Sequence, residues 1–198
     1  LTGVKFRDYD VVILSGAPAL SATITDRLKA FVKAGQSLLI TYSADTDLRN
    51  FNADWSDVSG IVIDEPMERN FSGAGFYSFA NIDNNHPVFS VFEFGKNQLP
   101  QARFFTLPRV HAIGRAKVLM RFSGDRPALV ENDYGDGRVL TFCGPISPTY
   151  TDLAAHAFFV PFMARLTEYL ASRLSRYDMN LYTGSNIVRG LSIKESLN

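Results

Sequence analysis

Short apolar runs separated by polar, glycine-containing segments mark the first half of the chain. Residues 10–14 and 37–42 form two such runs, and this pattern is typical of strands buried on both faces of a sheet. Between them, apolar residues recur at helical spacing after Ser21, a residue type that favours the start of a helix. Gly35 then supplies the left-handed conformation in which many helices end. The pattern predicts a right-handed β-α-β unit with parallel strands.

The middle of the chain is less periodic. The polar segment 43–59 predicts a loop or a short helix that Trp55 anchors against the body, followed by a short strand at 60–64. Residues 66–85 show no regular pattern and are expected to be irregular. At His86-Pro87 the proline suits the first turn of a helix, so we expect a short helix as far as residue 92.

The second half changes to a β-rich pattern. It predicts strands at 103–107, 110–113, 117–122, 128–131 and 138–142. The sequence Tyr134-Gly-Asp-Gly137 predicts a turn between the last two strands, because its glycines tolerate positive φ. An amphipathic helix is predicted at 158–174, and the tail after Arg176 has weaker periodicity and is expected to be partly extended. We therefore expect one domain, residues 1–175, and a C-terminal extension, residues 176–198.

The composition of the chain excludes several classes of protein. Of the 198 residues, 46% are hydrophobic and 13% aromatic, enough to form an aromatic-rich core without metal or disulfide support. Twenty basic residues balance twenty acidic ones, which argues against a nucleic-acid partner. Cys143 is the single cysteine, so an internal disulfide is excluded. No apolar segment is long enough to span a membrane. The start at Leu1 is neither an initiator Met nor a signal peptide, and we interpret the chain as a piece of a longer protein.

Several segments together resemble a known family. They are Tyr9-Asp-Val-Val-Ile-Leu, His86-Pro-Val-Phe, Arg126-Pro-Ala-Leu-Val-Glu, Tyr134-Gly-Asp-Gly-Arg-Val-Leu-Thr-Phe, Asp152-Leu and Phe159-Val-Pro-Phe-Met-Ala-Arg-Leu-Thr-Glu-Tyr-Leu-Ala. They are similar to the glutamine-amidotransferase-like domain of bacterial membrane proteins related to the Bat aerotolerance proteins. The resemblance covers most of the chain, but its motifs are strand edges, turns and helix starts.

This resemblance implies a fold and a location. The fold would be α/β: a three-layer sandwich of the flavodoxin-like, class I glutamine amidotransferase type, with a β-rich insertion or second half. Family members usually carry a strand and a helix before the Tyr9-Asp10 strand, and both would be missing here. The domain would lie on the periplasmic side of the cell membrane, joined to the membrane only through the parent chain. Its partners would be other domains of that parent or proteins of the same complex.

Cys143 is the obvious candidate nucleophile. An amidotransferase cysteine sits in a Gly-x-Cys-x-Gly turn between a strand and a helix, which exposes the sulfur and lowers its pKa. Here Gly144-Pro145 follows the cysteine, and no glycine stands two residues before it. Where the family pattern would place His-Pro-Glu, the chain has Ile146-Ser-Pro. The sequence favours a buried, inert thiol. The alternative is a cysteine-dependent hydrolase or amidotransferase in which His156 acts as the base for Cys143.

The other candidate groups favour structural roles. His86 is expected to start a helix and His111 to lie in a strand, and none of the histidines has zinc-ligand spacing. The acidic segment from Asp45 to Asp57 fails the EF-hand pattern, because Asn50 stands where that loop needs glycine; an irregular calcium site is the alternative to a solvated loop. Gly73-Ala-Gly75 does not open a helix and is interpreted as a loop. The neighbouring aromatic residues are expected to pack against the β-rich half, with an exposed partner surface as the alternative; they are Phe71, Phe76, Tyr77 and Phe79.

The leading hypothesis is a non-catalytic, extracytoplasmic domain that binds a partner or a ligand, without cofactor or metal. A small-molecule sensor coupled to a neighbouring domain is a further alternative. In open α/β sheets, ligands approach the carboxyl ends of the strands. We therefore predict the ligand-binding edge at Ser15, Gly16, Ser43, Cys143, Gly144 and Pro145.

Overall fold

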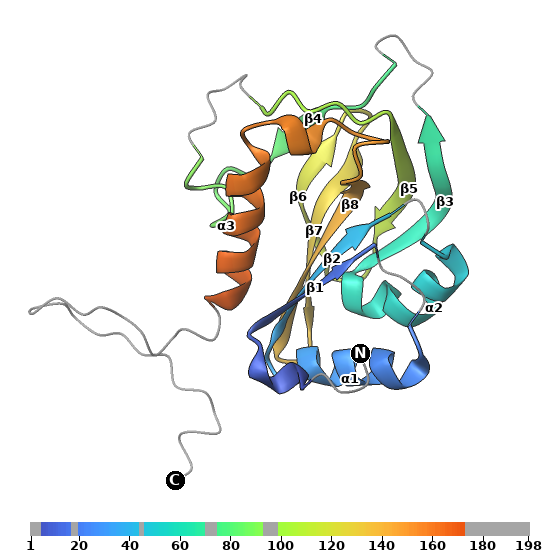
Figure 1. Cartoon of the computed structure of the whole chain (residues 1–198), viewed down its shortest axis with the longest axis vertical. Helices are drawn as coiled ribbons and strands as arrows, with labels where there is room; N and C mark the ends of the chain where they lie inside the picture. Colours follow the sequence, from blue (N-terminus) through green and yellow to red (C-terminus); the bar gives the residue numbers. More distant parts are fainter. Residues whose placement is uncertain (1–4, 17–19, 44–45, 70–74, 93–98, 173–198) are drawn as a thin grey trace, which may run out of the picture.

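A six-stranded sheet with the order β1-β2-β8-β7-β6-β4 forms the centre of the protein (Figure 1). The computed structural model describes residues 5–16, 20–43, 46–69, 75–92 and 99–172. The strands of the sheet are β1 Val11–Ser15, β2 Ser37–Tyr42, β4 Phe79–Ile82, β6 Lys117–Phe122, β7 Arg126–Tyr134 and β8 Gly137–Pro145. Strands β1, β2 and β8 are mutually parallel, and the sheet continues from β8 through β7 and β6 to β4 with antiparallel pairs. The prediction of an α/β fold is confirmed.

The predicted β-α-β unit is confirmed as β1, helix α1 (Ala22–Lys33) and β2. Ser21 stands at the N-cap of α1, and Gly35 follows the helix with a φ of 107°. The helix buries the apolar stripe that the sequence shows, including Leu28 and Phe31. Strand β2 is buried along its whole length, as expected of a strand paired on both sides.

Two layers of helices cover the sheet. Helix α3 (Phe159–Ala171) packs against one face, and α1 lies on the other face with α2 (Leu48–Ser59) (Figure 1). A separate antiparallel pair, β3 (Ile61–Arg69) and β5 (Thr106–Ala112), continues from α2. Two short 3₁₀ turns complete the described elements, η1 (Phe6–Asp8) and η2 (Leu153–Ala155).

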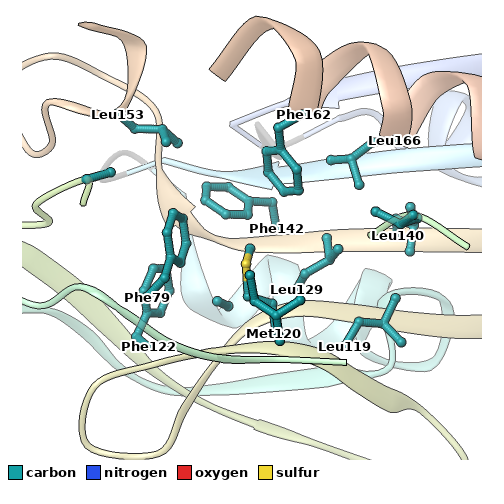
Figure 2. Close-up of a cluster of buried hydrophobic side chains, with 14 of the residues drawn as sticks. Phe79, Leu119, Met120, Phe122, Leu129, Leu140, Phe142, Leu153, Phe162 and Leu166 are labelled. Carbon is teal, nitrogen blue, oxygen red and sulfur yellow. The ribbon is translucent and has the colours of Figure 1, made fainter. Parts of the chain in front are cut away.

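Alternation along β8 divides the core into two clusters. Leu140 and Phe142 point to the α3 side, whereas Val139 and Cys143 belong to the cluster beneath α1 and α2. On the α3 side, Phe162 projects from the helix toward Phe142, and their ring centroids are 6.0 Å apart (Figure 2). Such edge-to-face aromatic pairs stabilise a core beyond the area they bury. The aromatic-rich core expected from composition is thus concentrated between α3 and the sheet.

The prediction that residues 66–85 are irregular is wrong in part. Strand β3 continues to Arg69, and β4 begins at Phe79. The end of β3 carries few apolar residues, so it gives no period-2 signal. It pairs with β5 as a strand, and Arg109 of β5 contacts Glu65 at 3.1 Å and Glu68 at 3.0 Å. Cross-strand charge pairs of this kind depend on the partner strand and are invisible in a local window.

The segment 43–59, predicted to be a loop or a short helix, contains helix α2, whose N-cap is Asp47 and which buries Trp55 as expected. Three other local expectations need correction. The expected helix after His86 is a series of turns in which the His86 carbonyl accepts hydrogen bonds from the amides of Phe89 and Ser90. The two strands predicted at 103–107 and 110–113 are the single strand β5. The last helix is shorter than predicted, and residues 176–198, the expected extension, lie outside the described residues.

Candidate functional site

A pocket of about 470 Å³ lies where the parallel strands β1, β2 and β8 end. The start of α3 and the segment around η2 close its other side. Its lining residues are Ser15, Gly16, Tyr42, Ser43, Pro145, Ile146, Ser147, Tyr150, Ala154 and Phe159. The carboxyl ends of parallel strands are the usual place for a ligand in an open α/β sheet.

Hydrogen bonds between the strand ends shape one wall of the pocket. The Gly16 amide donates to Thr41 Oγ1 at 3.2 Å, and Thr46 Oγ1 donates to the Gly16 carbonyl at 2.8 Å. Gly16 has a φ of 75°, and a Cβ atom there would lie 3.1 Å from the Cβ of Ser43. Glycine is therefore required at this turn, because the backbone conformation and the close approach both disfavour a side chain.

The lining residues that the structure describes in this pocket carry no charged side chain. Its described lining residues offer hydroxyl groups and apolar surface, and none of them is Asp, Glu, Lys, Arg or His. Burial raises the pKa of Tyr42 to about 12, so its phenol is neutral near pH 7. A charged ligand group would lose its hydration without gaining an opposite charge, which is costly. The chemistry of the walls therefore suits a neutral molecule with hydrogen-bonding groups.

Four of the six residues predicted at the ligand-binding edge line this pocket: Ser15, Gly16, Ser43 and Pro145. The other two do not. Gly144 faces the aromatic core, where an added Cβ would lie 2.8 Å from the ring of Phe122 and 3.2 Å from that of Phe104. Cys143 points to the opposite face of the sheet. The prediction missed the contribution of residues 146–159, because the sequence did not show that the start of α3 returns to the ends of β1 and β2.

The structure does not bring Cys143 and His156 together. The thiol is buried in the cluster beneath α1 and α2, and burial raises its pKa to about 12. His156 lies beside η2, next to Leu153 of the α3-side cluster, and its Nε2 is 3.1 Å from Asp152 Oδ1. Sheet and aromatic core thus separate the thiol from the imidazole. Asp152 also accepts from the Arg103 amide and from Arg103 Nε, both at 2.6 Å.

A buried polar cluster that the sequence did not reveal lies between α3 and the sheet. Tyr169 donates to Glu131 Oε1 at 2.6 Å, and Arg138 Nε lies 3.0 Å from the same oxygen. His86 Nε2 is 3.2 Å from the Tyr169 hydroxyl and 3.5 Å from Glu131 Oε2. Burial alone would raise the pKa of Glu131, but the hydrogen bonds from His86 and Tyr169 and the charge of Arg138 lower it to about 2. One available signal was Glu131 itself, an acid that directly follows the apolar run Ala128-Leu-Val within β7.

The remaining candidates have structural partners. Asp47 caps α2 by accepting hydrogen bonds from the amides of Arg49 and Asn50. Asn52 bonds the backbone of Ile63 in both directions, and Asp45 lies outside the described residues. His111 pairs with Asp64 at 2.8 Å on the exposed side of β5. Within the described ranges no group of three metal-ligating side chains gathers.

Two of the aromatic residues near Gly75, Tyr77 and Phe79, are core residues, whereas Phe76 is only partly buried. Tyr77 and Phe79 are buried in the α3-side cluster, and Phe79 stacks on Phe122 with centroids 5.4 Å apart. This packing against the β-rich half is the interpretation that the sequence favoured. Phe71 and Gly73 lie outside the described residues.

Comparison with known proteins shows the fold alone. No protein-family model and no curated protein matches the chain. Among solved structures, the chain is similar to the cytoplasmic protein STM3548 from Salmonella typhimurium, with a TM-score of 0.66, 15% identity, and coverage of 83% of this chain and 72% of that one. The cytoplasmic protein STM1381 from Salmonella typhimurium LT2 is also similar, with a TM-score of 0.60, 16% identity, and coverage of 85% and 72%. A cold-adapted β-galactosidase from Rahnella sp. R3 is similar over 82% of this chain but only 23% of the enzyme, with a TM-score of 0.58 and 21% identity.

The expected location has to be corrected. The sequence resemblance placed the domain on the periplasmic side of the cell membrane, within a membrane protein. Two of the similar structures carry the description of cytoplasmic proteins, which contradicts that expectation. In the part of the chain that the structure describes, no helix is both long and apolar enough to cross a membrane.

Proposed function

We propose that this protein is a non-catalytic binding domain that takes a small neutral, polyhydroxylated molecule in the pocket at the ends of β1, β2 and β8. The observation that carries the proposal is the described lining of that pocket, in which serine and tyrosine residues stand beside apolar side chains and none of the described residues is charged. Hydroxyl groups both donate and accept hydrogen bonds, as the hydroxyls of a sugar-like ligand require.

The hydroxyl-bearing and the apolar parts of the pocket wall suit the polar and the apolar surfaces of such a ligand. Ser15, Ser43 and Ser147 bring hydroxyl groups to the pocket, and Phe159 brings an aromatic ring. Small-molecule sites are commonly formed by apolar side chains with a few placed polar groups that fix the orientation of the ligand. The volume of about 470 Å³ falls in the range of about 300–1,000 Å³ that such sites occupy.

The absence of catalysis is part of this proposal and rests on Cys143. A nucleophilic cysteine needs a lowered pKa and a base within hydrogen-bond reach. Burial moves the pKa of Cys143 in the opposite direction, and the ring of His156 contacts Asp152 rather than the thiol. The cysteine-dependent hydrolase is therefore the weaker alternative.

The relationship to class I glutamine amidotransferases is also proposed rather than established by the comparisons. Three parallel strands, the helix between β1 and β2, and helices on both faces support a three-layer, flavodoxin-like arrangement in which antiparallel strands replace part of the sheet. In this view residues 1–175 form a domain that has kept the scaffold and lost the nucleophile. Proteins of the same complex remain the proposed macromolecular partners.

A ligand pair that differs at one carbon, where a neutral hydroxymethyl group is replaced by a carboxylate, tests the pocket. Thermal unfolding should be measured with neutral hexoses such as galactose and glucose, and with the corresponding uronic acids, at the same concentrations. A ligand that binds only the folded state raises the melting temperature. We expect a rise with at least one neutral sugar and none with its uronic acid. An equal response to both members of each pair, or to neither, would contradict the proposal.

A further inference from the structure

A second, apolar groove of about 580 Å³ lies between strand β1 and helix α3. Its described lining is largely apolar and consists of Ile13, Phe159, Val160, Met163, Ala164, Thr167, Glu168 and Ala171. Ile13 remains 49% exposed and Val160 72% exposed, although both are large apolar side chains. Contiguous exposed apolar surface commonly marks a ligand-binding groove or an interaction site. The groove is therefore a candidate binding surface.

This groove adjoins the pocket at the ends of β1, β2 and β8. Phe159, the first residue of α3, lines both of them. On β1, Ser15 lines the pocket and Ile13 lines the groove. Side chains two residues apart on a strand point to the same face of the sheet. The pocket and the groove thus meet at the first turn of α3, and one ligand can occupy both.

The groove leads away from the pocket along α3. The helix begins at Phe159, which shares the pocket with Ser15 at the carboxyl end of β1. Near the other end of α3, the carbonyl of Leu170 accepts a 3.0 Å hydrogen bond from Ser37, which pairs with Val11 at the start of β1. Helix α3 therefore runs antiparallel to β1, and its 13 residues make it about 20 Å long. A path of this length accommodates an extended alkyl chain.

The chemistry of the groove favours a neutral apolar chain over an anionic one. Glu168 is the only charged residue of its described lining, and Arg165 Nη1 lies 3.4 Å from the Glu168 carboxylate. An anionic amphiphile would meet this carboxylate and no cation in the described lining, and a charge that loses hydration without gaining a partner is costly. An alkyl chain, in contrast, would remove the apolar walls of the groove from water, which is favourable.

We infer that the ligand of this protein is a neutral amphiphile, a glycoside whose sugar occupies the pocket and whose alkyl chain lies in the groove between β1 and α3. The inference rests on the proposed function, because the pocket holds the sugar end of the ligand. The chain covers the two exposed apolar side chains of the groove, Ile13 and Val160. Phe159 lies where the sugar and the chain join, since it lines both parts of the site.

Glycosides that share a sugar but differ in chain length test the inference in the full-length chain. The methyl and octyl glycosides of glucose and of galactose should be titrated by calorimetry, below the concentration at which the octyl compounds form micelles. Each methylene group that is fully buried increases affinity by about fourfold, and an open groove buries only part of the chain. We expect the octyl glycoside to bind at least about tenfold more tightly than the methyl glycoside of the same sugar.

Val160→Asp and Val91→Asp form a matched pair of variants. The two valines are 72% and 57% exposed, but only Val160 lines the groove. Val160→Asp should remove the affinity advantage of the octyl over the methyl glycoside, because it places a carboxylate against the alkyl chain. Val91→Asp should retain that advantage. Ala154→Leu, which fills the pocket, should abolish the binding of both glycosides.

The other outcomes separate the groove from the pocket. Equal affinities for the methyl and octyl glycosides, or an octyl advantage that survives in Val160→Asp, would overturn the inference and leave the sugar pocket in place. Binding of the octyl glycoside that Ala154→Leu leaves unchanged would show that the groove acts without the pocket, and this too would overturn it. If none of the glycosides binds, the proposed function and this inference both fail.

Two further measurements identify a different occupant of the groove. Light scattering that finds a dimer, dissociated by Val160→Asp, would assign the groove to a second copy of the chain. A loss of stability in Val160→Asp that Val91→Asp does not share would assign it to another segment of this chain. Either result would overturn the inference.

Discussion

The hydroxyl of Tyr169 donates a 2.6 Å hydrogen bond to Glu131 Oε1 and so joins α3 to strand β7. Glu131 lies in the middle of the sheet on the face that α3 covers, and only 9% of its side chain is exposed. Arg138 also stacks its guanidinium over the Tyr169 ring, 4.5 Å from the centroid. The buried carboxylate of Glu131 thus links α3, the sheet and the turn at His86.

Tyr169→Phe should destabilise the fold, because it removes a donor from a buried carboxylate. Hydrogen bonds to charged groups contribute about 1.5–3 kcal/mol, and we expect a loss in that range. Chemical denaturation gives the free energy of unfolding. Tyr134→Phe is the control: Tyr134 keeps its ring beside Lys33, and its change should stay within about 0.5 kcal/mol. Equal losses in the two variants would contradict the role of the hydroxyl.

Stability should fall in acid because of Glu131. Its pKa of about 2 in the folded protein lies below the ordinary value for glutamate, so its ionised form stabilises the fold above about pH 4.5. That contribution, about 2 kcal/mol after allowance for solvent screening, should disappear as the pH falls toward 2. The difference in unfolding free energy between the natural protein and Glu131→Gln should therefore shrink from pH 7 to pH 3. A constant difference would argue against this linkage.

Gly60→Ala should be strongly destabilising. Gly60 ends α2 with a φ of 74°, and a Cβ there would lie 2.6 Å from the Cβ of Ala116 and 2.8 Å from that of Asn132. Gly124 has nearly the same φ, 75°, but an added Cβ would meet nothing within 4 Å. Gly124→Ala should cost about 1–2 kcal/mol for the left-handed backbone alone. Thermal or urea unfolding should show a clearly larger loss for Gly60→Ala, and similar losses would show that the close contacts relax without cost.

Phe142→Ala should remove a central part of the aromatic core. The Phe142 ring contacts those of Phe104, Phe122 and Phe162, and its side chain is fully buried. Truncation of a buried phenylalanine costs about 3–5 kcal/mol, which is a large part of the stability of a domain. Phe105→Ala, at a position that is 39% exposed, is the matched control and should cost much less. Urea unfolding compares the two variants.

Cys143 should not react with iodoacetamide in the native protein between pH 6 and pH 9. Its thiol is buried, and its pKa of about 12 leaves almost no thiolate at these pH values. Mass spectrometry should find the alkylated residue only after unfolding in urea. Complete alkylation of native protein at pH 6 would instead support the cysteine-dependent enzyme.

Most of the parallel part of the fold could be predicted from the sequence. The apolar runs of β1 and β2 and the apolar stripe of α1 are local signals, and the structure forms the predicted strand or helix at each of them. The end of β3 was missed because Glu65 and Glu68 pair with Arg109 across strands, and no period in the sequence marks such contacts. His86 was predicted to start a helix because Pro87 suits a first turn. Its ring is instead engaged by Tyr169 and Glu131, which are distant in the sequence.

The candidate site was predictable only on the side formed by strand ends. Ser15, Gly16 and Ser43 follow apolar runs, and the rule that ligands bind at the carboxyl ends of strands places them together. Ser147 and Tyr150 come from a segment without a local signal, and the position of Phe159, in the predicted last helix, depends on how α3 packs on the sheet. Gly144 and Cys143 were misplaced in the site because alternation and core packing turn them away from it.

Blocking the pocket gives the most direct test of its proposed role. Ala154 and Ala155 are neighbouring exposed residues of η2, but only Ala154 lines the pocket. Calorimetric titration of the neutral sugar that raises the melting temperature should be repeated with Ala154→Leu and Ala155→Leu. We predict that Ala154→Leu abolishes binding and that Ala155→Leu retains it, with both variants as stable as the natural protein. Unchanged binding in Ala154→Leu would contradict the assignment of the ligand to this pocket.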